Sequence, residues 1–240
     1  MIWWIIATFC AFFVKGLCGF ANTLVFTSIL SFGNSNVNIS PVELSLGYPT
    51  NIILAFKERR SIKWDVCLPL AAMVIAGSIP GIFLLKNADT TVIKIIFGFV
   101  IILVGLEMLI RELSPKKGTQ KQSKVVLTII GVLSGILCGL YGVGALLGAY
   151  VGRVTEDTKA FKANMCFVFF VENTFRITLY VISGIITLNT LKQAAVLMPV
   201  MLLGLGAGMF SGNYINDKLV KKFVIIMLII SGAALIWNNI

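Results

Sequence analysis

Apolar runs long enough to cross a lipid bilayer make up most of this chain. They lie at roughly residues 2–32, 41–56, 66–85, 91–110, 125–151, 163–186, 193–212 and 223–237. A membrane-spanning helix needs about 20 mostly apolar residues. Only 12% of the 240 residues are charged, against about 25% in soluble proteins. Because the runs are continuous, and not alternating as the strands of a β-barrel are, the sequence predicts an all-α polytopic membrane protein.

Two of these runs are interrupted by glycine and polar residues near the expected middle of the membrane, where the surroundings are most apolar. The first interruption reads VKGLCGFANTL at 14–24, and the second reads SGILCGLYGVGALL at 134–147. In hydrocarbon every backbone N–H and C=O needs a partner, so irregular backbone persists only where protein or water covers it. We therefore expect both interruptions to be the tips of re-entrant, broken helical hairpins that face each other or a cavity. The alternative is that the glycines only allow close helix packing.

The two halves of the chain resemble each other. The polar connector RELSPKKGTQKQSK at 111–124 divides the chain near its midpoint. This predicts a first transmembrane repeat at 1–112, a basic cytoplasmic linker at 113–124 and a second repeat at 125–240. The features that recur in the same order are LCG at 17–19 and 137–139, Asn51 and Asn173, and Pro69-Gly77-Gly81 and Pro199-Gly208-Gly212. Such a duplication is common in secondary transporters.

The basic residues decide between two topologies. If all eight runs cross the membrane, the loops on the two sides hold 10 and 7 lysines and arginines. If 2–32 and 125–151 instead enter and leave on the same side, 15 basic residues share one face and only Lys86 and Lys192 remain on the other. Cytoplasmic loops carry the excess of positive charge, which favours two inverted repeats, each a broken hairpin plus three transmembrane helices. Both termini are then extracytoplasmic; eight full spans are the alternative.

Composition argues against several classes of function. The net charge of +10 is explained by the orientation of membrane loops, so we expect no nucleic-acid partner. The chain has no histidine, the commonest metal ligand and the easiest proton relay, and we expect no metal or cofactor. A Walker A motif is missing from the sequence, which argues against an ATPase. The five cysteines lack the spacing of a disulfide framework.

The hairpin tips offer a site for an anion. The returning half-helices are expected to start near Asn22-Thr23 and near Gly142–Gly144. A helix start carries unpaired N–H groups and about half a positive charge, which attracts anions. Two such starts that meet at mid-membrane, contributed by inverted halves, are the arrangement found in several secondary transporters.

Polar residues within the apolar runs add to this candidate site. Asn51 and Asn173 lie near the middle of equivalent helices, where they serve either a substrate pathway or inter-helix hydrogen bonds. Arg176 is expected to pair with Glu172, four residues earlier, and to lend the site positive potential. Lys15 lies close to the first tip and is therefore a candidate for the site. The alternative is that its side chain extends to the membrane–water interface.

Other polar or reactive residues have local explanations. Ser40, Pro41 and Glu43 in SPVE fit a helix capping box with proline in the first turn, which accounts for the glutamate without a role in transport. Cys18 and Cys138 occupy matching places beside the tips. Small buried cysteines need no chemistry; the alternative is that their thiols handle reduced sulfur compounds.

The duplicated halves resemble a known family. Each half opens with a glycine-interrupted segment and continues with a helix that carries a mid-span asparagine; in the first half the basic loop in NIILAFKERRSIKWD follows. This pattern resembles the TauE/SafE sulfite exporter family over nearly the whole chain. Neither tip keeps the proline that usually follows the glycines in that family, and Asn22-Thr23 replaces glycines. The resemblance implies transport of small anions such as sulfite or organosulfonates, with Gly19, Asn22, Gly142 and Gly144 at the tip positions.

These observations define one functional hypothesis. The chain is expected to be a secondary transporter of the cell membrane, and not an enzyme, that moves a small anion by alternating access. Its partners are that anion and the lipid bilayer; homo-oligomer formation stays open. The residues expected to bind substrate are Gly19, Asn22, Thr23, Asn51, Gly142, Gly144, Asn173 and Arg176; Lys15 and Glu172 are expected to act in coupling or through their field, and Cys18 and Cys138 are candidate thiols. The alternatives are a membrane scaffold and a membrane enzyme that uses the two thiols.

Overall fold

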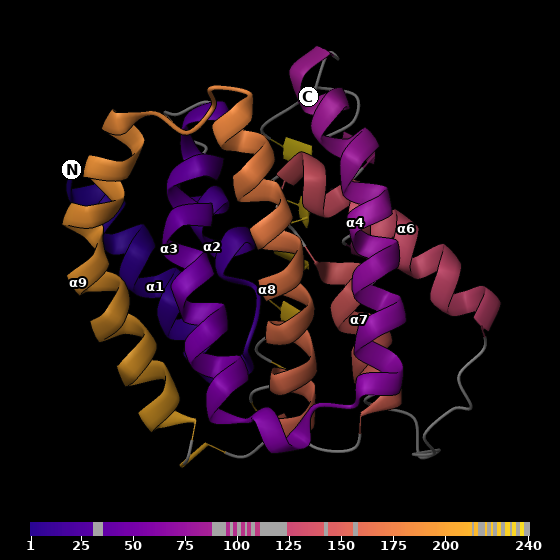
Figure 1. Cartoon of the computed structure of the whole chain (residues 1–240). Helices are drawn as coiled ribbons and strands as arrows, with labels where there is room; N and C mark the ends of the chain where they lie inside the picture. The colour runs from indigo at the N-terminus through magenta and orange to yellow at the C-terminus, as the bar shows by residue number, and fades with distance from the viewer. Residues whose placement is uncertain are drawn as a thin grey trace.

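The computed structural model of the chain is a bundle of helices (Figure 1). The structure describes residues 1–30, 36–87, 124–141, 144–155 and 158–212, with scattered positions between 95 and 110 and between 214 and 237. Its helices are α1 (Ile2–Cys18), α2 (Asn22–Leu30), α3 (Asn36–Lys57), the short η1 (Arg59–Ser61), α4 (Trp64–Asn87), α6 (Lys124–Tyr141), α7 (Ala145–Val154), α8 (Thr158–Ile182) and α9 (Leu188–Ser211). No β-strand occurs among the described residues, which confirms the predicted all-α fold.

Within the described residues, three helices are long and apolar enough to cross a membrane. They are Trp64–Gly81 within α4, α8 and α9. Two shorter apolar helices, Ile2–Cys18 and Thr128–Gly139, lead to the two interruptions. At 1.5 Å per residue, the 17 residues of α1 extend about 25 Å, less than the hydrocarbon core of about 30 Å. The arm that leads to the first interruption is therefore too short to span the membrane alone.

The first interruption is a sharp turn between α1 and α2. Helix α1 ends at Cys18, and Gly19 adopts a left-handed conformation with φ of 85° while its N–H bonds the Lys15 carbonyl at 2.7 Å. Ala21 also has a positive φ, 70°, before α2 begins at Asn22. Helix α2 then folds back along α1, since the ring centroids of Trp4 and Phe26 lie 5.8 Å apart. The first tip is thus a helical hairpin whose open end lies on the N-terminal side.

The second interruption lies between α6 and α7. Helix α6 ends at Tyr141, and Gly144 is the N-cap of α7; Gly142 lies outside the described residues. The far end of α7 contacts the segment after α3, because Lys63 Nζ donates to the Val154 carbonyl at 3.1 Å. Figure 1 shows that segment at the opposite end of the bundle from the N-terminus. The two hairpins therefore open toward opposite ends of the molecule.

Glycines hold the helices of the two halves together. Helix α4 packs along α6, where Gly77 and Gly81 face the backbone at Gly135 and Gly139. Helix α9 packs along α1, where the backbone at Phe9, Phe13 and Gly16 meets Gly204 and Gly208. Figure 1 shows α3 and α8 between these two pairs. Each hairpin is thus braced by a helix from the other half, as small residues at membrane helix contacts permit.

The inverted-repeat relationship stays a prediction. Helix α1 of the first half packs on α9 of the second, and α6 of the second half packs on α4 of the first. An inverted duplication would produce this reciprocal pairing, and it would also make the two hairpins open to opposite ends, as they do here. The linker at 113–123, and most of the segments expected at 91–110 and 223–237, lie outside the described residues. The boundaries 1–112, 113–124 and 125–240 therefore remain expectations from the sequence.

The close helix contact at Gly208 predicts a large effect of a single methyl group. A Cβ at this position would collide with the Phe13 carbonyl, whereas a Cβ at Gly206 in the same helix would meet nothing within 4 Å. Gly208→Ala is expected to destabilise the protein by about 1–3 kcal/mol through overpacking. Gly206→Ala is expected to be neutral or to stabilise by up to about 1 kcal/mol. Thermal unfolding in detergent measures both; equal midpoints would contradict the close contact.

Candidate functional site

A buried cavity lies where the two hairpin tips meet. The first tip contributes Phe20, Ala21, Asn22, Thr23 and Leu24 to its lining, and the second tip contributes Gly144. The spanning helices complete the wall with Lys15 from α1, Glu43 and Asn51 from α3, and Phe169, Asn173 and Arg176 from α8. Residues from both halves of the chain therefore enclose one polar space.

The structure brings together most of the residues that the sequence singled out. Seven of them line the cavity: Lys15, Asn22, Thr23, Asn51, Gly144, Asn173 and Arg176. Gly19, Glu172, Cys18 and Cys138 are not in its wall, and Gly142 lies outside the described residues. Gly19 instead forms the turn, with its carbonyl accepting a bond from Cys166 Sγ at 3.2 Å. The local sequence signals thus found the cavity but not every detail of its wall.

Two helix starts adjoin the cavity. The first backbone bond within α2 runs from Val25 N–H to the Ala21 carbonyl at 3.1 Å, and the corresponding bond at α7 runs from Gly148 to Gly144 at 2.9 Å. The N–H groups that precede these bonds have no partner within their own helix. Both helix starts therefore direct partial positive charge toward the same space.

Glu43 is the residue that sequence reasoning missed. Its Oε1 accepts hydrogen bonds from Asn22 Nδ2 and from Thr23 Oγ1, the latter at 2.9 Å. The capping-box interpretation was wrong, because α3 begins at Asn36 and Glu43 lies about two turns inside it. A signal was available: Glu43, Gly47 and Asn51 are four residues apart and so lie along one side of the helix.

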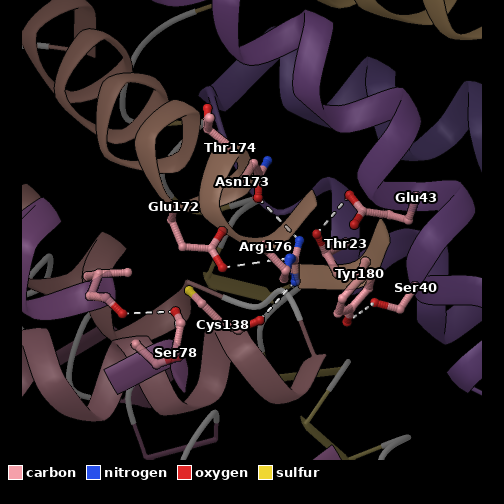
Figure 2. A network of polar contacts seen from close by, with 12 residues as sticks. Thr23, Ser40, Glu43, Ser78, Cys138, Glu172, Asn173, Thr174, Arg176 and Tyr180 are labelled. Atoms are coloured by element: carbon pink, nitrogen blue, oxygen red, sulfur yellow. Dashed lines mark hydrogen bonds and ion pairs between the residues drawn. The ribbon is translucent and has the colours of Figure 1, made fainter. Parts of the chain in front are cut away.

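Arg176 is the best-connected cation of the site. Its Nη1 donates to the Cys138 carbonyl at 2.8 Å and its Nη2 to Asn173 Oδ1 at 3.2 Å, while Nε lies 3.6 Å from Glu172 Oε1. Figure 2 shows the guanidinium between these three groups. The predicted pair of Glu172 and Arg176 is present and buried. Cys138 takes part through its backbone carbonyl.

Lys15 is buried and does not reach the membrane interface. Its side chain is only 2% exposed, and its Nζ donates to the Gly47 carbonyl at 3.3 Å. The lining therefore holds two cations, Lys15 and Arg176, and one carboxylate, Glu43, with Glu172 directly behind Arg176. In this low-dielectric setting two positive and two negative groups balance.

Asn51 is polar, buried and without a partner. Its side chain is 1% exposed and lines the cavity, yet neither Nδ2 nor Oδ1 has a hydrogen-bond partner among the described residues. A buried polar group left unpaired costs about 1–3 kcal/mol, and such groups in native proteins call for an explanation. By contrast, Asn173 accepts from Arg176. An amide directed into a polar cavity is available to bind a ligand.

The cavity is narrow. Its free space holds about one water molecule, and the ring of Phe169 packs against Gly144 so closely that a Cβ there would collide with it. A larger occupant therefore requires the tips or the α8 side chains to move apart.

Fold and site together define a class of protein. Large apolar side chains such as Leu68, Leu203 and Phe210 are exposed on the outside of the bundle, where lipid covers them, while two broken hairpins meet at a buried polar cavity. This is the architecture of a membrane transport protein.

The comparison with protein families agrees. Residues 4–235 match the family model described as Sulfite exporter TauE/SafE, and the chain belongs to this family of membrane transporters for sulfite and related sulfur anions. No curated protein and no solved structure matched the chain. The family resemblance stated from the sequence is thereby confirmed. Membership in the family implies a small anionic substrate and a lipid environment.

The buried ion pair predicts a strong coupling in stability. Glu172→Gln leaves the Arg176 guanidinium buried without its counter-charge, which is expected to destabilise the protein by about 3–5 kcal/mol. The double variant Glu172→Gln/Arg176→Met removes both charges and is expected to recover more than half of that loss. Unfolding in detergent of the two single variants and the double variant measures the coupling. Additive effects would mean that the two side chains do not depend on each other.

Proposed function

We propose that this protein is a secondary transporter that moves a small sulfur oxyanion or organosulfonate across the cell membrane by alternating access. The observation that carries the proposal is the cavity at the two tips, where two helix starts and the unpaired amide of Asn51 converge. Membership in the TauE/SafE family supports the class of substrate.

The chemistry of the wall suits an anion with several oxygens. Backbone N–H groups at both tips and Nδ2 of Asn51 are donors at the same cavity, and a bond from a neutral donor to a charged oxygen is stronger than one between neutral groups. Lys15 from α1 and Arg176 from α8 supply positive potential. In this proposal Asn22, Thr23, Asn51, Gly144, Asn173 and Arg176 surround the substrate, while Gly19 and Gly142 shape the turns.

The opposed hairpins provide a route to alternating access. The first hairpin opens toward the N-terminal end of the bundle and the second toward the end that holds η1. Movement of one hairpin away from α3 and α8 would open the cavity to one side only, and movement of the other would open it to the opposite side. The narrow cavity, which is too small for an anion, would then correspond to a state between the two.

This mechanism predicts the sidedness of the chain. The basic residues at the end of α3 and in the segment after it (57–63), and those in the first turns of α8 (158–162), lie at the end opposite the N-terminus (Figure 1), and the positively charged side faces the cytoplasm. Both termini are therefore expected on the outer side of the cell membrane. Alkaline phosphatase fused to either terminus should be active and green fluorescent protein fused there should be dark; termini on opposite sides would contradict two paired hairpins.

Asn51 gives the sharpest test of the transport site. Because its amide is unpaired, Asn51→Leu is expected to keep or raise stability, and to lower anion flux at least about tenfold through the loss of a bond to a charged group. Flux of sulfite, thiosulfate and methanesulfonate is measured in proteoliposomes. Ile52→Leu is the matched control, since the neighbouring Ile52 is 43% exposed and faces away. Full flux in Asn51→Leu would remove the cavity as the site.

The same assay separates the alternatives. Cys18 and Cys138 are buried and absent from the cavity wall, so Cys18→Ala/Cys138→Ala is expected to retain flux; loss of flux with the fold intact would favour an enzyme or carrier that uses thiols. A wild-type protein that moves none of the three anions would favour a scaffold.

A further inference from the structure

We propose that Glu43 is the proton-coupling residue of this transporter: its carboxylate occupies the donors of the first tip, and it takes up a proton when a substrate anion binds. The inference rests on the proposed function and deepens it, since it assigns the coupling ion and the residue that carries it.

The position of the carboxylate is that of a bound anion. Asn22 and Thr23 are the first two residues of α2, and both side chains donate to the same oxygen of Glu43. All three residues are buried, and all three line the cavity. A helix start is where an external oxyanion would bind, so Glu43 already satisfies the donors that the substrate needs. Figure 2 shows Glu43 and Thr23 in this contact.

Charge balance supplies the second step of the argument. The titratable groups that act on Glu43 are Lys15 from α1 and Arg176, Glu172 and Tyr180 from α8. Among the described residues two cations face two carboxylates, and the net charge of this group is zero. A monoanion that enters this group would leave one negative charge uncompensated in a medium of low dielectric constant, which is strongly unfavourable. One proton on a carboxylate restores the balance.

The remaining neighbours of α3 do not change this balance. Helix α2 contains no titratable residue, and the only charged residue of α9 is Lys192, which is exposed. No further charge from these elements compensates a bound anion.

Glu43 is better suited to accept the proton than Glu172. Glu172 lies outside the cavity wall and is held by Arg176 at 3.6 Å. Glu43 lines the cavity and is bound by the neutral side chains of Asn22 and Thr23. Protonation of Glu43 therefore breaks no ion pair, and it frees two donors for the substrate.

The step is a simple proton transfer. A proton from the side to which the cavity is open binds one carboxylate oxygen of Glu43; Asn22 Nδ2 and Thr23 Oγ1 then donate to the incoming anion. When the cavity opens to the other side, the anion leaves, the proton dissociates, and the carboxylate returns to its two donors. One proton and one monoanion move together, and no net charge crosses the membrane.

The test uses proteoliposomes that contain the full-length protein, with methanesulfonate and sulfite as probes. Methanesulfonate stays a monoanion between about pH 5 and about pH 8, so its own ionisation does not contribute to the pH dependence. In wild type, an inward proton gradient of about one pH unit should drive up to about tenfold accumulation. Glu43→Gln should retain anion exchange at zero gradient, independent of pH, and lose the accumulation. Glu58→Gln, at the helix-to-loop junction outside the cavity, should behave as wild type.

The outcomes separate the two proposals. Accumulation by Glu43→Gln equal to wild type, or wild-type flux that ignores the proton gradient, would overturn the coupling role and leave the transport function standing. Absence of any wild-type flux of either anion would overturn the transport function, and the coupling with it. If Glu43→Gln does not fold, purified wild type decides: addition of sodium methanesulfonate to a weakly buffered solution should cause uptake of about one proton per bound anion, and no uptake would overturn the proposal.

Discussion

The need to satisfy backbone groups inside a membrane is the constraint on which this structure depends. A helix that stops at mid-membrane leaves N–H and C=O groups that lipid cannot bind, so each interruption has to be covered by protein. Here α9 covers α1 and α4 covers α6 through contacts between glycine-bearing backbones. The same packing brings both tips against α3 and α8. The covering that the interruptions require is thus what creates the cavity.

Buried charge sets the second constraint. Among the described residues, two cations, Lys15 and Arg176, and two carboxylates, Glu43 and Glu172, lie at or beside the cavity. A pocket whose only charged residues were Lys15 and Arg176 would bind an anion tightly and release it slowly. A transporter has to release its substrate in every cycle. Internal carboxylates lower that affinity, and a reversible proton on one of them allows affinity to differ between the steps of a cycle. The proposed role of Glu43 therefore serves the release of the anion as well as its binding.

The sequence predicted the features that depend on neighbouring residues, and missed those that depend on distant ones. The interruptions, the ion pair of Glu172 and Arg176, and the polar positions Asn51 and Asn173 are visible in composition and spacing. Glu43 was misread because a local motif explained it, while its partners Asn22 and Thr23 come from another helix. Cys18 and Cys138 were singled out by their matching places in the predicted repeats, but a matching place in the sequence does not put a side chain at the cavity, and neither cysteine lines it.

The two halves of the chain contribute different charged residues to the cavity, and this difference bears on which hairpin responds to the proton. Counted from Asn51 and Asn173, the place of Glu43 is taken by Met165 in the second half, and the place of Arg176 by Leu54 in the first. At the first tip the side chains of Asn22 and Thr23 donate to Glu43. The second tip lines the cavity with Gly144, which has no side chain. If the two halves are related as predicted, Glu43 and Arg176 have no charged counterparts, and the two proposed hairpin movements would then depend differently on protons. Protonation of Glu43 would loosen the first tip from α3 and leave the second unaffected, so the proton would act on the gate at the N-terminal end of the bundle.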